Sequence, residues 1–392
     1  MGTSIPLLIV GAGPFGLAVS AFARRHGVEH VIAGEPMGFW KSHMPKGMFL
    51  RSGCDWHLDP FGEHTMVRYL EGLRLEPEDV DPLPLDVYLD YCEWFRRQKG
   101  IEPVRERVAR LDCAGGSPGV DRAGGSPGFE ALLESGERIH ARSVVLALGF
   151  GYFKSEPEPY PGLFPPGSWV HTSDLVDFSA LEGKRVLIIG GRQSAFEYAA
   201  LILEHGAGAV HLSYRHATPA FEPSDWSWVN PIVDSMVGDP GWFRRLTAAE
   251  KEAINRRMWQ EGRLKLEPWL AARLADERLA LHPHTHVIEC SQAPGGALDV
   301  RLSDGTSIVV ERVVLATGYK VDAARIPMLA QGNVLERLAV RNGFPELDDH
   351  LQSSVLGLFF TSMCAAQDFG PFFAFTVSVR ASARLIGEEL LR

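Results

Sequence analysis

The first residues with a spacing that suits chemistry form a glycine-rich turn near the start of the chain. The turn follows an apolar stretch over 4–10 and leads into a helical pattern over 17–25. In such a turn the first glycine permits a tight bend, the second lets the backbone approach a pyrophosphate, and the third lets the helix pack closely on the strand. The helix N-terminus would face the anion. We therefore predict a dinucleotide site whose residues are Gly11, Gly13, Pro14, Phe15 and Gly16.

An acidic residue stands where the ribose of that dinucleotide would lie. Glu35 follows the apolar strand expected over 30–33 and comes 24 residues after Gly11. A carboxylate at this place accepts hydrogen bonds from ribose hydroxyls. The alternative is a plain strand, helix and strand without a ligand, but here the strand, glycines, helix and acid are all in register. The first turn is therefore a regular dinucleotide motif.

A second strand, turn and helix pattern occurs in the middle of the chain. An apolar strand over 184–189 precedes the turn, and a helix follows to about residue 204. Arg192 stands where the second glycine would be, Ala195 stands where the third would be, and Gly191 shifts the flexible position by one. The predicted nucleotide contacts of this turn are Gly190, Gly191, Arg192, Gln193 and Ser194.

The residues after the next strand reverse the charge found at Glu35. Arg215 and His216 follow the strand expected over 209–214, and Arg215 comes 25 residues after Gly190. A guanidinium can hold a 2′-phosphate in a fork of hydrogen bonds, whereas a carboxylate would repel it. This site therefore favours NADPH over NADH; the alternative is a solvated arginine at a strand end.

Composition and charge narrow the class of protein. The 392 residues exceed the usual size of one core, and Lys plus Arg number 39 against 49 Asp plus Glu, a net charge of −10. The lack of a basic cluster argues against nucleic acid as a partner. No apolar run reaches the ~18 residues of a membrane span, and residues 1–10 lack the features of a signal peptide. We expect a cytoplasmic protein without a membrane partner. The sequence leaves open whether the protein forms a homodimer.

The cysteines argue against a dithiol relay. They include no C-x-x-C, the motif that disulfide reductases place beside the flavin, and their spacing does not suggest a metal site. Electrons accepted by a flavin would then go to another acceptor, and by elimination we expect dioxygen. The five residues are Cys54, Cys92, Cys113, Cys290 and Cys364.

Two similar strands indicate a duplicated architecture. Residues 143–149 and 312–318 are apolar strands that end in glycine, each preceded by a hairpin-like segment. We predict an α/β fold with two Rossmann-like dinucleotide-binding domains, in which the NADPH domain is inserted into the FAD domain and carries a helical insert. The chain would return to the first domain near Gly318. The predicted boundaries are 1–160 for the first part of the FAD-binding domain, 161–310 for the NAD(P)H-binding domain including the helical insert 217–282, and 311–392 for the second part of the FAD-binding domain.

These pieces together resemble the two-dinucleotide flavoproteins, and within them the single-component flavin-dependent monooxygenases of the flavin-containing, N-hydroxylating and Baeyer–Villiger types. Besides the two turns, the matching pieces are 316–319, 357–360 and 164–171, the last being similar to the family's linker signature with one extra residue. The resemblance implies that NADPH reduces FAD, that dioxygen adds to the flavin as a C4a-(hydro)peroxide, and that one oxygen atom passes to a small organic substrate. It also implies a site that excludes water.

The resemblance also selects residues near the flavin. The stretch 40–52 lies where flavin-contacting segments of the family usually run, although the asparagine of the flavin-containing subgroup is missing. A structural loop with an aromatic plug is the alternative. The catalytic candidates are Ser52, Asp55 and His171, of which His171 is better explained as a hinge residue. Further predicted cofactor contacts are Trp40, Met48, Arg51, Gly149, Gly318, Phe369, Gly370 and Phe372.

Two helical segments complete the prediction. The insert is expected to hold one helix from a capping box at Thr247 to about residue 262, and another over 267–278. We expect the insert to be a lid. We also expect a C-terminal helix that runs from Pro371 to about Leu391 and has its N-terminus beside the flavin. The residues that would cover nicotinamide or substrate, unless they form the core of the insert, are Asp225, Trp226, Trp228 and Trp242.

The leading function is therefore an NADPH-dependent FAD monooxygenase acting on a small organic molecule. One alternative on the same fold is an NAD(P)H oxidase or flavin reductase that passes electrons to dioxygen, a quinone or a partner protein. Another is a flavin-bound redox sensor that controls a partner without turnover.

Overall fold

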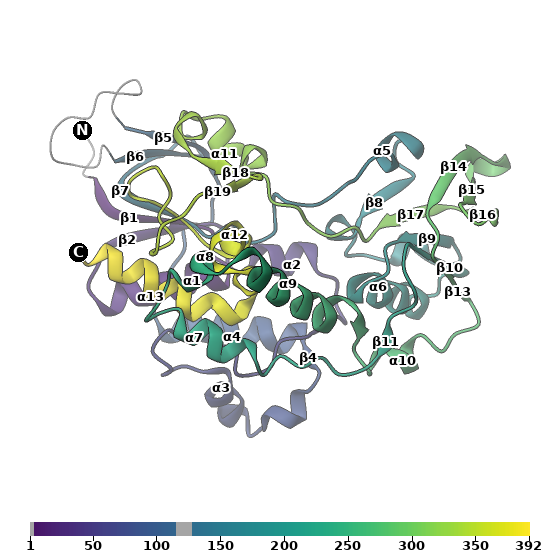
Figure 1. The fold of residues 1–392 in the computed structure, drawn as a ribbon, viewed down its shortest axis with the longest axis horizontal. Coiled ribbons are helices and arrows are strands. Elements are labelled where there is room, and N and C mark those ends of the chain that lie inside the picture. The colour runs from purple at the N-terminus through teal and green to yellow at the C-terminus, as the bar shows by residue number, and fades with distance from the viewer. Residues whose placement is uncertain (1–3, 115–127) are drawn as a thin grey trace.

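The computed structural model describes residues 4–114 and 128–392 and has two lobes, the first built on a mixed sheet, in which β5 and β6 are antiparallel, and the second on a parallel sheet (Figure 1). Both ends of the chain contribute to the sheet of the first lobe, because β20, near the C-terminus, pairs in parallel with β7. Leu8 of β1 lies opposite Val31 of β2 and Val144 of β7. In order across the sheet the strands are β2 (His30–Ala33), β1 (Ile5–Val10), β7 (Arg138–Leu146), β6 (Phe129–Leu133) and β5 (Val108–Cys113), with β20 (Leu358–Phe360) also on β7.

Apolar helices cover this sheet. In α1 (Pro14–Arg25) every residue from Pro14 to Ala23 is buried, so the helix lies inside the lobe. It packs against α13 (Val379–Leu390), where a side chain at Gly387 would overlap the ring of Phe22. The other elements of this lobe are α2 (Gly38–His43), β3 (Phe49–Leu50), α3 (Met66–Leu73), β4 (Leu83–Pro84), α4 (Leu85–Gln98), α11 (Pro327–Ala330), β18 (Val340–Arg341), β19 (Phe344–Pro345) and α12 (Ala366–Phe369).

The second lobe repeats the plan. β9 is followed by a glycine turn and by α6 (Gln193–Glu204), and β17 pairs with β9 as β7 pairs with β1. The predicted α/β fold of two Rossmann-like domains, one inserted into the other, is confirmed. Its sheet is β13 (Leu279–Pro283), β10 (Ala209–Tyr214), β9 (Arg185–Ile189), β17 (Arg312–Leu315) and β8 (Trp169–His171), flanked by α5 (Tyr160–Leu163) and an antiparallel sheet of β14 (Val287–Gln292), β15 (Leu298–Leu302) and β16 (Ser307–Val310).

The sheet topology corrects one predicted boundary. β17 lies between β9 and β8, so 312–315 belongs to the second lobe and a division at 310/311 cuts through that lobe's sheet. The chain returns to the first lobe only after β17, near Gly318. The reason is that β17, which corresponds to β7 of the first lobe, must pair with β9 in the second sheet before the chain can cross back to the first lobe.

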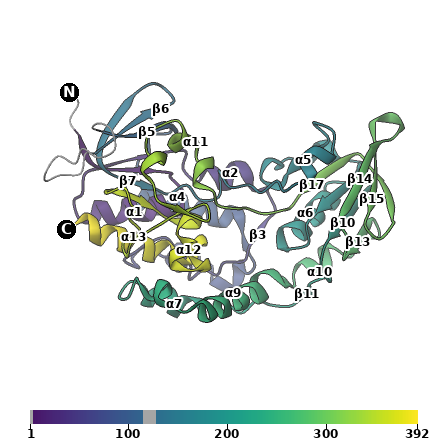
Figure 2. The same ribbon diagram turned by 45° about the horizontal axis from the view of Figure 1, so that its top comes forward.

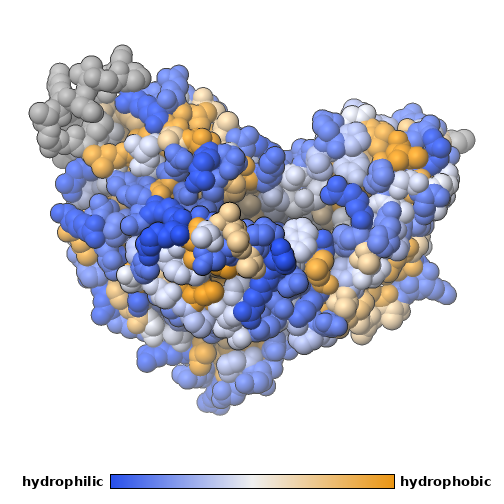
Figure 3. All heavy atoms as spheres, viewed as in Figure 1, coloured by the Kyte–Doolittle hydropathy of each residue, from blue (hydrophilic) through white to orange (hydrophobic). Residues whose placement is uncertain are grey.

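The helical insert is a strap that spans both lobes (Figures 1 and 2). Its α7 and α8 pack against the C-terminal segment 366–378 of the first lobe, and α10 packs against α6 of the second. On another side, a notch separates the lobes (Figure 3). The elements of the strap are β11 (Ala220–Phe221), α7 (Val229–Ser235), α8 (Trp242–Arg245), α9 (Ala248–Arg263), β12 (Lys265–Leu266) and α10 (Leu270–Arg273).

The helices predicted in the insert had mixed outcomes. The capping box is confirmed, since the Thr247 hydroxyl accepts from Glu250 N and the Glu250 carboxylate accepts from Thr247 N. The helix predicted over 267–278 is wrong, because only the single turn α10 forms. Asp276 binds the backbone N–H of Arg278 in a turn, and β13 then begins at Leu279, so the insert ends before residue 282.

The long C-terminal helix predicted from Pro371 is also wrong. Short 3-10 turns cover Pro371–Ala374 and Thr376–Ser378, separated by the extended residue Phe375, and the helix starts only at Val379. Only a 3-10 turn therefore begins at Pro371, and the α-helix N-terminus lies at Val379. Across the described parts of the chain, none of the helices has both the length and the apolar character to span a bilayer.

Candidate nucleotide and flavin site

The first glycine turn has the geometry of a pyrophosphate cradle. Gly11 has φ +109°, and a side chain there would overlap the carbonyl oxygen of Ala147. A side chain at Gly16 would overlap the carbonyl oxygen of Gly11, so helix and turn touch. A Cβ at Gly13 would meet no atom within 4 Å. Backbone at the N-terminus of α1 is therefore open to an anionic group, which fits the pyrophosphate of FAD.

The neighbouring predicted contacts divide into packing residues and one polar residue. Pro14 occupies the first turn of α1 and Phe15 is buried, so both support the turn from inside. Glu35 is exposed, and its carboxylate lies 3.6 Å from the guanidinium of Arg105, which is also exposed. Such a surface pair is weak. The carboxylate at the end of β2 is thus accessible to ribose hydroxyls.

Arg51 binds residues of the insert, and its predicted contact with the flavin stays a prediction. Its guanidinium donates to Glu267 at 2.6 Å and to the carbonyl of Gly262 at 2.8 Å, and it also binds Ser224. All of these partners belong to the insert. Arg51 therefore ties the first lobe to the strap.

Trp40 and Met48 are packed into the first lobe. The Trp40 ring lies 4.9 Å from the ring of Tyr88, and Met48 is buried with its carbonyl accepting from Leu85 N. Trp40 is only partly buried, so one side of its ring remains open. Contact of these two residues with flavin stays a prediction.

The two acidic or hydroxyl candidates lie where three segments meet. Ser52 is 3.1 Å from the hydroxyl of Thr376, in the C-terminal segment. The exposed carboxylate of Asp55 accepts from the amide of Asn230, whose oxygen accepts from the indole of Trp56 at 2.8 Å. Sequence reasoning missed Asn230, because nothing local shows that α7 would return to this loop.

His171 is buried between β8 and the crossing after β17, and its role as a catalytic residue or a hinge stays a prediction. The side chain is 1% exposed. Its Nδ1 accepts from Ser173 N at 3.1 Å, which leaves Nε2 to donate to the carbonyl of Gly318 at 3.1 Å. Burial lowers the pKa of His171. A neutral ring with both nitrogens occupied connects β8 to the crossing after β17.

The two crossings between the lobes are packed together by aromatic rings. Tyr319 lies 5.0 Å from Phe150 and 5.6 Å from His171, and burial raises the pKa of Tyr319 to about 12. Gly149 and Gly318 have φ of +59° and +75°, so each turn after β7 and β17 uses a left-handed residue. Neither glycine is crowded, and their cofactor contacts stay predictions.

The C-terminal aromatic residues lie in the core, and their predicted contact with the cofactor stays a prediction. Phe369 and Phe372 are fully buried, and the Phe372 ring packs edge-on against Phe243 of α8 at 6.2 Å. A Cβ at Gly370 would lie 2.7 Å from the Phe372 ring. These residues anchor the insert on the first lobe.

The second glycine turn shares the backbone of the first but is crowded by side chains. Gly190 has φ +140°, and a side chain there would overlap the carbonyl oxygen of Ala316. Gly191 does not supply the shifted flexible position: its Cβ would lie 2.5 Å from the Tyr214 side chain, so the residue is small to admit that ring. Gln193 is buried and accepts from Glu267 N at 3.1 Å, while Ser194 is exposed.

Cationic side chains gather at this end of the second sheet. Arg215 is exposed, and among the described residues no hydrogen bond or ion pair engages it. His216 donates from Nδ1 to the carbonyl of Ala217 at 2.7 Å, and burial, opposed by that bond, lowers its pKa. Arg192 contacts the insert through Trp259 and the carbonyl of Arg263. An anion such as a 2′-phosphate fits this edge.

A buried acid in α6 was not assigned a role from the sequence. Glu197 is 2% exposed, and its carboxyl accepts from Phe49 N, in the other lobe, at 2.8 Å. Burial raises the pKa of Glu197 to about 8, partly offset by that N–H and by Arg273. The position of Glu197 directly after the glycine turn was the signal that could have drawn attention to it, but nothing in the sequence indicated that Phe49 would be its partner.

Over residues 5–372 the sequence matches a protein family described as pyridine nucleotide-disulphide oxidoreductase. The chain belongs to this family. The prediction of an oxidoreductase on a two-dinucleotide fold is thereby confirmed.

Known proteins similar to this oxidoreductase include several monooxygenases. The FAD-dependent urate hydroxylase of Xanthomonas campestris is 32% identical over 142 residues, which cover 35% of this chain and 28% of that protein. The indole-3-pyruvate monooxygenase YUCCA1 of Oryza sativa subsp. japonica is 27% identical over 80% of this chain and 76% of its own length. The structure of ornithine N-hydroxylase from Kutzneria sp. 744 has a TM-score of 0.79 at 17% identity, covering 100% of this chain and 99% of that one. The fold that the resemblance implied is confirmed.

The cysteines of this oxidoreductase do not form the redox pair that the family name suggests. All five lie in described residues and are free thiols. Burial raises the pKa of Cys364 to about 12, so this thiol stays protonated. The structure thus offers no dithiol to take electrons from a flavin.

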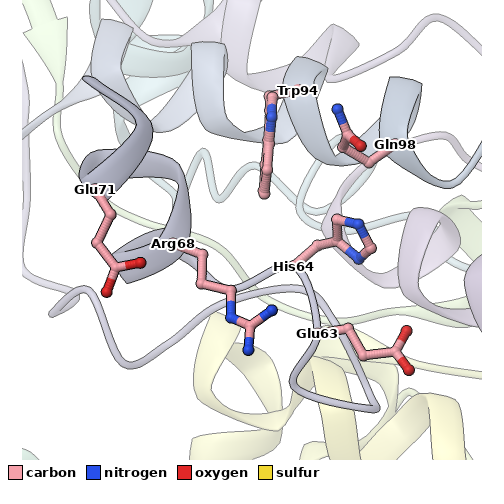
Figure 4. A pocket seen from close by; sticks show the side chains of 6 residues that line it. All are labelled: Glu63, His64, Arg68, Glu71, Trp94 and Gln98. Carbon is pink, nitrogen blue, oxygen red and sulfur yellow. The ribbon is translucent and has the colours of Figure 1, made fainter. Parts of the chain in front are cut away.

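A hollow away from both glycine turns is lined by polar side chains (Figure 4). The Trp94 ring of α4 points into it across from Arg68 of α3. Nearby, Asp59, Glu63 and His64 approach one another within 4.8 Å. Lys99 pairs with Asp59 at 2.9 Å and with Glu63 at 3.2 Å, and Arg25 also pairs with Glu63, so two cations of the protein already balance the two carboxylates.

Proposed function

We propose that this oxidoreductase is an NADPH-dependent FAD monooxygenase that inserts one oxygen atom into a small organic substrate. One observation carries the proposal: the chain pairs an open pyrophosphate cradle at Gly13 with a cationic second site at Arg215, and has no dithiol beside them. Two nucleotide sites without a dithiol favour dioxygen as the electron acceptor. The name of each full-length relative above contains monooxygenase or hydroxylase, which supports the same reaction class.

The residues of the first turn would hold FAD. Backbone N–H groups at the start of α1 would meet its pyrophosphate, and the carboxylate of Glu35 would accept from its ribose. Bound FAD would supply hydride acceptance and, once reduced, formation of the C4a-(hydro)peroxide with dioxygen. The protein contributes position and the exclusion of water.

The residues of the second turn would hold NADPH. The guanidinium of Arg215 would bind the 2′-phosphate, with His216 and the N-terminus of α6 beside it. The strap that crosses from α6 to the C-terminal segment would limit access of water between the lobes. Five free thiols favour a reducing compartment, and we propose the cytoplasm.

Rapid mixing of the NADPH-reduced enzyme with dioxygen tests this function. The proposal predicts a long-lived absorbance of the flavin C4a adduct, shortened when substrate is present. Immediate return to oxidised flavin with stoichiometric hydrogen peroxide, with or without NADP+, would identify an NAD(P)H oxidase instead. Steady transfer of electrons to a quinone or a protein acceptor under nitrogen would identify a reductase.

A further inference from the structure

Arg192 occupies the place from which a dinucleotide pyrophosphate is normally approached by bare backbone. It precedes α6 with φ −114° and ψ −179°, and Gly13 precedes α1 with the similar values −84° and −170°. At Gly13 the space beyond a Cβ is open. The Arg192 side chain therefore starts from the point that faces the phosphate in the first lobe.

In the structure this side chain is held by the end of α9. The guanidinium lies 4.7 Å from the Trp259 ring centroid and donates to the carbonyl of Arg263. The guanidinium of Arg263 faces the same ring at 5.6 Å. Trp259 is 48% exposed, so the ring is a surface residue fixed by these two cations. The contact ties the strap to the N-terminus of α6.

The guanidinium of Arg192 has no anionic partner in its present position. In the described part of the chain no carboxylate forms an ion pair with it. Burial, followed by the charge of Arg263, lowers the pKa of Arg192, so the protein surroundings disfavour its charge. A phosphate would relieve this, because a charge-assisted hydrogen bond is roughly twice as strong as a neutral one.

We infer that Arg192 is a phosphate-binding residue that exchanges between Trp259 and the pyrophosphate of NADPH, so that nucleotide binding releases the Trp259 ring. The inference rests on the proposed second-site nucleotide. Its consequence is competition: the contact with Trp259 and the contact with phosphate use the same guanidinium. Any change that weakens the first must strengthen nucleotide binding, provided that Arg192 remains.

Equilibrium binding of NADP+ to the FAD-loaded, oxidised enzyme separates the two contacts. Arg192→Ala removes the phosphate ligand and should raise the Kd for NADP+ by about tenfold or more. Trp259→Ala removes only the competing contact and should lower the Kd by about two- to fivefold. Arg256→Ala is the matched control, because Arg256 is exposed on the same helix and lies 4.0 Å from Glu252 of that helix. Its Kd should stay at the wild-type value.

Tryptophan fluorescence provides a second readout. NADP+ should change the part of the emission that Trp259→Ala removes, in the wild type but not in Arg192→Ala, in which the Trp259 ring is already separated from that guanidinium. Kd values that shift in the same direction in Arg192→Ala and Trp259→Ala would overturn the exchange, since a purely structural contact affects both alike. Absence of NADP+ binding would overturn it as well. Neither readout needs oxygenation, so a failure to make oxygenated product with these binding shifts intact would reject the proposed function alone.

Discussion

The two glycine turns of this oxidoreductase have nearly the same backbone conformation but differ in the side chains that they carry. Gly11 and Gly190 take the same left-handed turn against the carbonyl of an equivalent alanine. The first turn then presents bare backbone at Gly13, whereas the second presents Arg192. The comparison teaches that two similar backbone turns can carry different side chains, and we propose that these side chains decide which dinucleotide binds and how readily it leaves.

The helices after the turns differ in the same sense. Seven residues after the first glycine, α1 has the fully buried Ala18 and α6 has the buried acid Glu197. The apolar helix belongs to a lobe whose ligand we propose to be resident. The buried acid of α6 accepts a hydrogen bond from Phe49 N in the other lobe, so the helix after the second turn is linked directly to the first lobe.

The largest expected effect concerns the third glycine position of the motif, which is Gly16 in the first lobe and Ala195 in the second, because only the second lobe accommodates a methyl group there. Gly16→Ala would overlap the Gly11 carbonyl and should lower the free energy of unfolding by about 3 kcal/mol or more. An alanine normally stabilises a helix relative to glycine by about 1 kcal/mol, so the sign itself is diagnostic. Urea denaturation measures it. Ala195→Gly is the counterpart and should cost only about 1 kcal/mol; a Gly16→Ala protein as stable as the wild type would refute the close packing.

The buried acid of the second lobe should make stability depend on pH. The folded pKa of Glu197 is about 8 against 4.5 for a free carboxyl, so the folded state binds the extra proton between these values. The contribution of Glu197 to the free energy of unfolding is complete below pH 4.5 and falls by about 1 kcal/mol per pH unit as the pH rises towards about 8.

Glu197→Gln keeps the hydrogen-bond acceptor and removes the titration. The variant should therefore gain stability relative to the wild type between about pH 5.5 and about pH 7.5. Unfolding by urea at each pH measures the difference. A difference that does not change with pH would show that Glu197 titrates normally.

Gly13→Ala tests the open cradle of the first lobe. The added methyl group meets no protein atom, so the unfolding free energy of the apoprotein should not fall, while the Kd for FAD should rise by about tenfold or more, or about 1.4 kcal/mol. Flavin fluorescence during titration measures the Kd. Full occupancy at the wild-type Kd would place the pyrophosphate elsewhere.

Arg215→Ala tests the charge reversal in the second lobe. Loss of the guanidinium should raise the KM for NADPH by about tenfold and leave the KM for NADH almost unchanged. Lys184→Ala, which removes one exposed charge at the opposite end of β9, should change neither. Equal increases for both nucleotides would contradict a 2′-phosphate contact.

The fold and the turns could be predicted because their signals are local. Spacing of glycines, buried strands and the acid or arginine at strand ends all fall within about thirty residues, the length of one strand, helix and strand unit. Contacts across the lobes were not predictable in this way. Arg51 binds Glu267, and Asn230 binds Asp55, more than 170 residues away in each case. The packing of Phe372 against α8 was not predictable either, because it depends on the path of the insert.

Anaerobic mixing of the FAD-loaded enzyme with limiting NADPH or NADH tests whether hydride crosses from a nucleotide at the second turn to a flavin at the first. We expect loss of the visible band of oxidised flavin, faster with NADPH than with NADH. In Arg215→Ala the rate with NADPH should fall to that with NADH. A flavin that neither nucleotide reduces, or that both reduce equally in the wild type, would contradict the account.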